Sequence, residues 1–366
     1  MRPRYVNFLT NAASSASGIF IPLYAKALGS TADQIGFIVA AFNGSVLVSS
    51  FLFGRAADVQ GSRRILRAGL LLSAVVAITQ ALAFDSATLG VSRALLGFCT
   101  GMYPAALLAY AKSADRLMGK FASYGSLGWG LGNLLAGAVS MFHPGVYWQV
   151  FAISSGAWFL AFFFVAGEAF TGSGGLRIPL FPRAILRRNF PVYSAMFIRH
   201  AGANMVWVVF PLFLQEIRGF SEFEIGLLYA FNPLVQFAVM QSIDRFPSAP
   251  LVVGGLLGSS ITFLLFTIAA DFWSVLATQG LIGASWATLY VGSLKFITER
   301  NPETGTAGGI FNSVMSTSSI VGPVIGGFLA LSSYTTPMYV ASGLATLSLL
   351  FYAFEVRRGP AADRRA

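Results

Sequence analysis

The chain has 366 residues, of which 55% are hydrophobic and only 10% are charged. About a quarter of the residues of a soluble globular protein are charged, so this composition excludes an ordinary water-soluble protein and favours a lipid bilayer as solvent. The net charge of +10 does not indicate nucleic-acid binding, because the basic residues lie in short breaks between apolar runs. The single cysteine, Cys99, excludes a disulfide framework and a thiolate metal cluster.

In chain order, twelve apolar runs are long enough to cross a bilayer, which takes about 20 residues. They are residues 5–28, 33–53, 65–84, 88–111, 118–141, 146–168, 191–215, 222–242, 250–270, 272–296, 306–331 and 335–355. The first run also has features of a signal peptide, since Arg2 and Arg4 precede it, but its polar interruptions and its recurrence later in the chain favour a membrane span.

The longest break, 169–190, is a linker rich in Gly, Pro and Arg near the middle of the chain. We therefore expect an all-α membrane protein with an N-terminal bundle of six helices, 1–168, a cytoplasmic linker, 169–190, and a C-terminal bundle of six helices, 191–366.

The basic residues are distributed unequally between the two sets of breaks. Twenty Lys and Arg residues lie on the side of the N-terminus, whereas only Lys26 and Arg218 lie on the opposite side; Arg93 and Arg199 lie inside spans. Because cytoplasmic loops of membrane proteins carry the excess of positive charge, both termini are predicted to be cytoplasmic. The expected location is the plasma membrane.

The two halves of the chain resemble each other. Residues 22–43 (PLYAKALGSTADQIGFIVAAFN) align with 211–232 (PLFLQEIRGFSEFEIGLLYAFN), and 132–137 (GNLLAG) align with 322–327 (GPVIGG), at offsets of 189 and 190. The segment 93–97 (RALLG) aligns with 279–283 (QGLIG). This repeat predicts two pseudo-symmetric six-helix bundles, and repeated halves of this kind place a substrate site between them near the midplane.

The break between spans 2 and 3 reads GRAADVQGSRR, residues 54–64. It resembles the loop signature of the major facilitator superfamily, with Val59 at a position that is usually basic; the matching residues are Gly54, Asp58, Gly61, Arg63 and Arg64. The resemblance implies the twelve-helix fold of that superfamily, transport by alternating access, and a conformational latch in this loop. A plain positive-inside loop explains the arginines but not the spacing of the glycines and the aspartate.

Two further patterns resemble the drug:proton antiporter branch of that superfamily. Span 4 carries Arg93-x3-Gly97-x3-Gly101, and small residues recur in spans 5 and 11 at Gly128, Gly132, Gly137, Gly322, Pro323, Gly326 and Gly327. The resemblance implies proton-coupled efflux of amphipathic molecules and helices that slide on these residues. Close helix packing of a general kind is the alternative, since small residues let any two membrane helices approach.

Polar residues recur at helical spacing inside the spans, and spans 1 and 7 repeat the same steps. Because polar side chains in a membrane usually face a cavity, we expect a central substrate cavity. Its predicted lining is Asn7, Asn11, Ser15, Asn43, Arg93, Thr100, Arg199, His200, Asn204, Trp207, Asn232, Gln236, Trp286 and Tyr290. Gln279 occupies the position in span 10 that Arg93 holds in span 4.

His200 and Arg93 are the candidates for proton coupling. A histidine near the bilayer centre can carry a proton, although a hydrogen-bonded packing histidine is the plainer interpretation. Arg93 is a candidate because it resembles the span-4 arginine that is linked to proton transfer in the antiporter branch. A structural hydrogen bond to helix carbonyls is an alternative of nearly equal weight. For Arg199 we slightly favour a side chain that reaches the cytoplasmic surface over one that pairs with an anionic substrate.

The acidic residues, Glu222 among them, fall near the outer ends of the spans. A cavity without a carboxylate suits neutral, amphipathic or anionic molecules. The competing hypothesis is therefore a permease for an organic anion or metabolite. Motifs of intramembrane enzymes and the phosphate loop of ATPases are absent from the sequence, so we expect no enzyme activity, no cofactor and no metal. The expected partners are a small-molecule substrate, protons and the lipid bilayer, but not nucleic acid, and the chain is expected to be a monomer.

Overall fold

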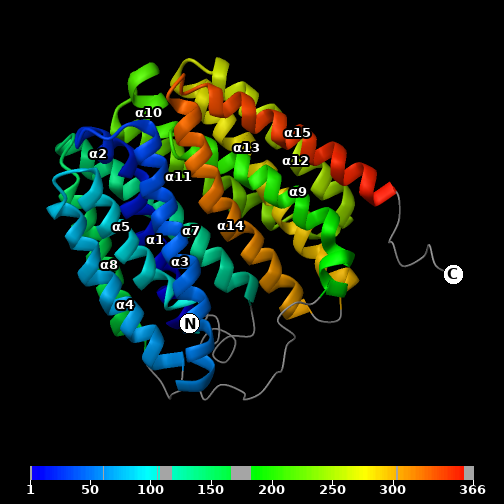
Figure 1. Cartoon of the computed structure of the whole chain (residues 1–366), viewed down its shortest axis with the longest axis horizontal. Coiled ribbons are helices and arrows are strands. Elements are labelled where there is room, and N and C mark those ends of the chain that lie inside the picture. The colour runs from blue at the N-terminus through cyan, green and yellow to red at the C-terminus, as the bar shows by residue number, and fades with distance from the viewer. Residues whose placement is uncertain are drawn as a thin grey trace.

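A computed structural model describes residues 2–60, 62–104, 106–107, 118–165, 183–301 and 304–357 of the chain. Within these ranges all regular secondary structure is helical, and there is no β-strand (Figure 1). Within the described residues, each of the twelve predicted spans corresponds to one helix or to consecutive helical segments separated by a short break. Residues 105 and 108–111 of the fourth span and 166–168 of the sixth lie outside the described residues. The prediction of an all-α membrane protein is therefore confirmed.

The helices of the N-terminal half follow the predicted spans in order. They are α1 (Arg2–Ile19) with α2 (Ile21–Ala27), α3 (Ala32–Gln60), α4 (Ser62–Thr79) with the short turn η1 (Gln80–Leu82), α5 (Ser86–Gly101), α7 (Met118–Phe142) and α8 (Trp148–Phe164). Those of the C-terminal half are α9 (Arg183–Trp207) with α10 (Phe210–Leu212) and η2 (Phe213–Ile217), α11 (Glu222–Met240), the turn η3 (Ile243–Arg245), α12 (Ser248–Ile268), α13 (Phe272–Arg300), α14 (Thr304–Ala330) and α15 (Thr336–Arg357).

Two helices are longer than the predicted spans. Helix α3 continues to Gln60 through most of the predicted loop. Helix α9 begins at Arg183, inside the predicted linker and ahead of Pro191. Its first turns are held in place because Ile185 and Asn189 are buried and the Asn189 Oδ1 accepts from the Asn301 amide. Residues 169–182 of the linker lie outside the described residues, and the domain boundaries at 168 and 191 stay a prediction.

Seven helical stretches in the described part of the chain are both long enough and apolar enough to cross a membrane. The others are shorter or more polar, such as α8, which is apolar but has 17 residues. Four of the remaining ones, α1, α5, α7 and α13, contribute polar side chains to the central cavity described below. These polar side chains, which would be costly against lipid, face the cavity instead.

The helix contacts repeat from one half to the other. Within the N-terminal half α1 packs on α7, α3 on α5, and α4 on α8; the matching contacts in the C-terminal half are α9 on α14, α11 on α13, and α12 on α15. The two halves meet through α7 with α11 and through α3 with α14, which are again symmetry-related pairs. The two pseudo-symmetric six-helix bundles predicted from the repeat are thus present (Figure 1).

Local features repeat with the same offset. Span 1 breaks at Phe20 ahead of Pro22, and span 7 breaks ahead of Pro211, because proline lacks an N–H and its ring disturbs the preceding turn. Asp85 and Asp271 cap α5 and α13. The Thr88 backbone N–H lowers the pKa of Asp85, and the Ser274 backbone N–H lowers the pKa of Asp271.

Three apolar cores hold the described helices together. One core lies in the N-terminal half and contains Trp158, and a second lies in the C-terminal half and contains Phe311. The third core combines residues of both halves, among them Phe20 beside α2 and Phe210 in α10. The halves therefore share a core only at the end that carries α2 and α10, which we call the sealed end.

Candidate functional site

A cavity of about 770 Å³ lies between the two halves. Side chains of α1, α3, α5 and α7 line it from the N-terminal half, and side chains of α9, α11, α13 and α14 line it from the C-terminal half. These two sets of four helices are symmetry-related. The core shared by both halves closes the cavity on the side of α2 and α10. The cavity is large enough for a drug-sized molecule.

Thirteen of the fourteen predicted residues line this cavity. They are Asn7, Asn11, Ser15, Asn43, Arg93, Thr100, Arg199, His200, Asn204, Trp207, Asn232, Gln236 and Trp286. The structure brings them together from six helices, α1, α3, α5, α9, α11 and α13. Whether they bind a substrate stays a prediction.

Tyr290 is the exception, because it is not among the residues that line the cavity. Its ring stacks on Trp286 with centroids 5.6 Å apart and packs on Phe311 of α14 at 5.9 Å. The helical spacing placed Tyr290 on the correct face of α13, but α14 covers it. Tyr290 thus packs on Trp286, which itself lines the cavity.

Amide side chains form two matching clusters on opposite walls. In the N-terminal half the Asn7 amide donates to the Phe121 carbonyl at 2.8 Å, and the Asn11 amide donates to the Asn7 Oδ1 at 3.0 Å. In the C-terminal half the Asn232 amide donates to the Gln279 Oε1 at 3.0 Å, and the Gln236 amide donates to the Asn232 Oδ1 at 2.6 Å. Both walls therefore present neutral donors and acceptors.

Arg93 is buried in the N-terminal wall, with an exposed fraction of 5%. Its Nη1 donates to the Gln80 Oε1 at 3.2 Å, and its guanidinium lies over the Phe42 ring, 4.0 Å from the centroid. The Nε atom is buried without a partner in the described part of the structure. Arg93 is thus held by a neutral amide and an aromatic face, and no described carboxylate neutralises it.

Arg199 does not reach the surface, contrary to the interpretation we slightly favoured from the sequence. Its exposed fraction is 2%, and its Nε donates to the Ser259 Oγ of α12 at 2.9 Å. The guanidinium lies 5.0 Å from the Trp286 ring centroid and 5.5 Å from that of Phe263. A polar partner on the neighbouring helix and two aromatic faces hold the side chain inside the bundle.

His200 stacks on Trp286 with ring centroids 5.0 Å apart. Its Nε2 lies 3.5 Å from the Ser319 Oγ of α14, and its Nδ1 is buried without a partner among the described residues. Trp207, further along the same helix, packs edge-on against Tyr229 and Phe266. The C-terminal wall is therefore an aromatic surface around one imidazole.

Among the residues at the site that the sequence did not identify are Gln80, Phe42 and Tyr229. Gln80 lies at the end of a span without helical periodicity, and only the fold shows that it binds Arg93. Phe42 and Tyr229 are aromatic residues in apolar runs, where nothing distinguishes a cavity-lining ring from a packing ring. Only the arrangement of neighbouring helices in the fold shows which of these rings line the cavity.

The predicted sliding residues fall into two groups. An added Cβ at Gly128 or Gly132 would strike the backbone of α1, and one at Gly322 or Gly326 would strike α9, so these contacts lie within one half. Gly137, Gly327 and Pro323 instead contact the other half.

The contacts between the halves are also symmetric. A Cβ at Gly137 would lie 2.9 Å from the Gly226 Cα of α11, and one at Gly327 would lie 2.5 Å from the Ala32 carbonyl oxygen at the start of α3. A Cβ at Gly36 would strike the Pro323 carbonyl. The two seams between the halves therefore depend on glycine for their close approach.

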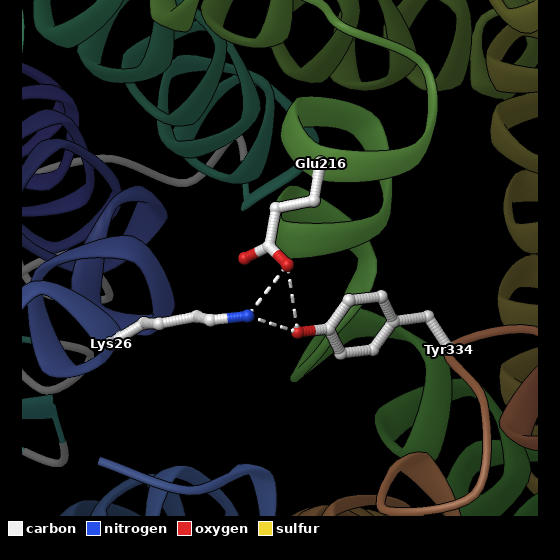
Figure 2. A network of polar contacts seen from close by, with 3 residues as sticks. All are labelled: Lys26, Glu216 and Tyr334. Atoms are coloured by element: carbon white, nitrogen blue, oxygen red, sulfur yellow. Dashed lines mark hydrogen bonds and ion pairs between the residues drawn. The ribbon is translucent and has the colours of Figure 1, made fainter. Parts of the chain in front are cut away.

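Polar contacts cross between the halves at two places at the sealed end. The Lys26 Nζ of α2 lies 2.6 Å from the Glu216 Oε2 of η2 and donates to the Tyr334 hydroxyl at 2.7 Å (Figure 2). Deeper in the protein, the Tyr147 hydroxyl donates to the Glu222 Oε1 at 2.8 Å. The first contact is partly exposed and the second is buried.

The predicted latch is only partly described. Gly54 and Asp58 lie in the last turns of α3, and Arg63 and Arg64 lie in the first turn of α4. Gly61 and the side chains of residues 54–62 lie outside the described residues, so the latch stays a prediction. The described residues contain no group of three or more His, Cys, Asp or Glu side chains able to hold a metal ion.

Comparison with known proteins identifies the relatives of this chain. The family model described as Major Facilitator Superfamily matches residues 5–240 and 192–366. The quinolone resistance protein NorA of Staphylococcus aureus (strain COL) is 21% identical over 355 residues, which cover 92% of this chain and 90% of that protein. Multidrug resistance protein 1 of Bacillus subtilis (strain 168) is 29% identical over 168 residues, 44% of this chain and 43% of that protein.

Solved structures share the fold at low sequence identity. A crystal structure of a variant of the nucleoside transporter NupG matches with a TM-score of 0.82 at 11% identity, covering 96% of this chain and 98% of that one. The peptide transporter POT in complex with sulfate matches with a TM-score of 0.77 at 15% identity, covering 98% of this chain and 94% of that one.

Proposed function

Because this chain belongs to the Major Facilitator Superfamily, we propose that it exports small amphipathic organic molecules in exchange for protons. It is a multi-pass membrane protein and a secondary transporter. The observation that carries the proposal is the central cavity, which symmetry-related helices of both halves line and which the shared core of the described residues closes at the sealed end. A site between two bundles that meet at one end suits alternating access.

The direction in which the cavity faces follows from the charges. The sealed end carries α2 and η2 with Lys26 and Arg218, the side that is poor in basic residues. By the positive-inside rule the sealed end is outside and both termini are cytoplasmic. The conformation is then an inward-facing one, ready to receive cargo from the cytoplasm.

The chemistry of the lining supports the cargo class. Among the described residues that line the cavity there is no Asp or Glu, whereas aromatic rings and neutral amides are abundant. Such a surface binds flat apolar molecules by their faces and orients them by a few hydrogen bonds. NorA and multidrug resistance protein 1, by their names, are resistance proteins, which supports a drug-like cargo here.

Proton coupling is assigned to His200, with Arg93 as the second candidate. His200 lies at the cavity with one ring nitrogen unpartnered among the described residues, so it is placed to accept a proton when water enters. Arg93 lacks an acidic partner among the described residues, so the binding of a proton or an anion near it changes the net charge around the guanidinium. The loop around Asp58 serves as the latch that stabilises one conformation.

Flux in proteoliposomes tests this proposal. Purified protein is reconstituted, and uptake of a fluorescent quinolone and of a neutral dye is recorded with and without a pH gradient. We expect uptake into the lumen to rise severalfold when the lumen is acidic. Equal uptake with and without the gradient would reject proton coupling, and uptake no faster than into empty liposomes would reject both cargoes.

The second candidate function is a permease for an organic anion or metabolite. Two buried arginines at the cavity, Arg93 and Arg199, without an acidic partner in the described structure, favour it. On this hypothesis Arg93→Ala or Arg199→Ala abolishes binding of an organic anion and leaves the binding of neutral dyes unchanged. Loss of both kinds of binding instead supports the general amphipathic cavity.

A further inference from the structure

Glu222 is a buried carboxyl group that the proposed transport cycle does not use. It is the first residue of α11, and only 6% of it is exposed. Its position near the end of a span suggests a solvated side chain, yet the Tyr147 side chain of the other half covers it. Tyr147 is itself 7% exposed and packs on the Tyr24 ring, with centroids 5.3 Å apart.

Only half of this carboxyl group is satisfied. The Tyr147 hydroxyl donates to Oε1 at 2.8 Å, whereas Oε2 is buried without a hydrogen-bond partner in the described structure. No described Lys, Arg or His nitrogen lies within ion-pair distance of it. Burying an ionised carboxylate without a counter-charge costs far more free energy than burying a neutral acid with one unpartnered oxygen.

The charged and titratable groups around this site have other partners. On α11 itself the Glu224 carboxylate accepts from the Ser221 backbone and hydroxyl. Helix α7 contributes the neutral residues Asn133 and Gly137, which approach the backbone of α11.

The neighbouring elements add no counter-charge. In η2 the Glu216 carboxylate pairs with Lys26, and the Arg218 guanidinium beyond it donates to the Thr267 carbonyl. At the start of α13 the Asp271 carboxylate accepts from the backbone of its own first turn. Within the described residues, Glu222 therefore has Tyr147 alone as a side-chain partner.

We propose that Glu222 is a proton-binding site that couples the pH outside the cell to closure of the sealed end. With the halves closed, Glu222 holds a proton on Oε2 and accepts the Tyr147 hydrogen bond on Oε1. When the halves part at this end, Tyr147 stays with the N-terminal half, water reaches the carboxyl group, and it releases the proton. This inference rests on the alternating access of the proposed function, but not on the identity of the cargo or of the transported ion.

The sign of the effect follows from linkage. The closed state binds one proton more than the open state, so acid favours closure and alkali favours opening. Release of one proton makes the ratio of open to closed molecules rise by up to about tenfold per pH unit.

The test measures the distance across the sealed end as a function of pH. His143 on the α7–α8 turn and Ser332 after α14 are exposed and belong to different halves. Spin labels are attached to cysteines introduced by His143→Cys and Ser332→Cys in a Cys99→Ala background. The His143→Cys substitution also removes the histidine on that turn. Distance distributions are recorded in lipid nanodiscs between pH 5 and pH 8.

We expect the open population to rise with pH when Glu222 is present. Glu222→Gln keeps an acceptor for Tyr147 but cannot ionise, so we expect that variant to stay closed with no dependence on pH. Glu224→Gln is the matched control, because it changes a carboxylate two residues away that is engaged elsewhere, and we expect it to behave like the parent. A pH dependence that is equal in the parent and in Glu222→Gln would overturn the proposal.

A failure of alternating access is distinguishable from a failure of this site. Gly36→Ala places a Cβ against the Pro323 carbonyl at the other seam and so promotes opening without touching Glu222. If Gly36→Ala opens the sealed end equally at every pH, Glu222 is not the proton site. If the sealed end stays closed at all pH values in every variant, the proposed function itself fails.

Discussion

A single methyl group at the seam between the halves should shift the conformational equilibrium. Gly226 of α11 faces α7, and a Cβ added there would lie 2.7 Å from the Gly137 Cα and 2.9 Å from the Asn133 carbonyl oxygen. Both are backbone atoms, so no side chain can rotate away. Because α7 and α11 belong to different halves, the strain exists only while the sealed end is closed.

The magnitude follows from this geometry. An ordinary Cβ contact begins at 3.4 Å, so the two helices must separate by at least about 0.7 Å. Overpacking of this kind costs about 1–3 kcal/mol, which corresponds to a shift of about 5- to 150-fold toward the open conformation. The Gly226→Ala substitution itself favours helix, so loss of helical structure does not account for the effect.

The assay is the distance between spin labels at positions 143 and 332 at a fixed pH. Gly343→Ala is the matched control, because it lies in a helix of the same half and a Cβ there meets no atom within 4 Å. We expect Gly226→Ala to open the sealed end and Gly343→Ala to leave it as in the parent. Identical distance distributions for the two variants would refute the reasoning about the seam.

Three further predictions address the cycle. Asp58→Asn should cut flux in proteoliposomes while leaving cargo affinity nearly intact, and unchanged flux would remove the proposed latch. His200→Ala should abolish the stimulation of flux by a pH gradient, and a preserved stimulation would place proton coupling elsewhere. Lys26→Ala should raise the open population less than about fivefold, because the Lys26–Glu216 pair is partly exposed and such pairs contribute at most about 1 kcal/mol. That effect should disappear in high salt, because salt screens exposed charges. A larger effect that salt does not change would mean that the Lys26–Glu216 pair is shielded from water.

The repeat in the sequence carried most of the predictive information. Matching polar steps in spans 1 and 7 identified one face on each helix, and the fold brings those faces together at one cavity. Symmetry is a strong guide here because a duplicated fold places equivalent residues in equivalent environments. The helix breaks at Pro22 and Pro211 and the caps at Asp85 and Asp271 follow the same offset.

What the sequence did not predict depends on which helices are neighbours. Tyr290 has the helical spacing of a cavity residue, but Phe311 of α14 covers it. Arg199 was expected at the surface, but Ser259 of α12 offers a hydrogen bond inside the bundle. Glu222 lies near the end of a span, and only its contact with Tyr147 shows that it is buried. Periodicity identifies a face of a helix but not what covers that face.

The central claim is that one cavity is exposed to the two sides of the membrane in turn. Its most direct test uses a protein that carries Lys26→Cys and Glu216→Cys in the Cys99→Ala background, reconstituted in proteoliposomes. Flux of a fluorescent quinolone is measured before and after the two cysteines are bridged by a reducible bifunctional thiol reagent. The account predicts that the bridged protein still binds the quinolone but does not transport it, and that a reductant restores the flux. Undiminished flux through the bridged protein would contradict alternating access at this end.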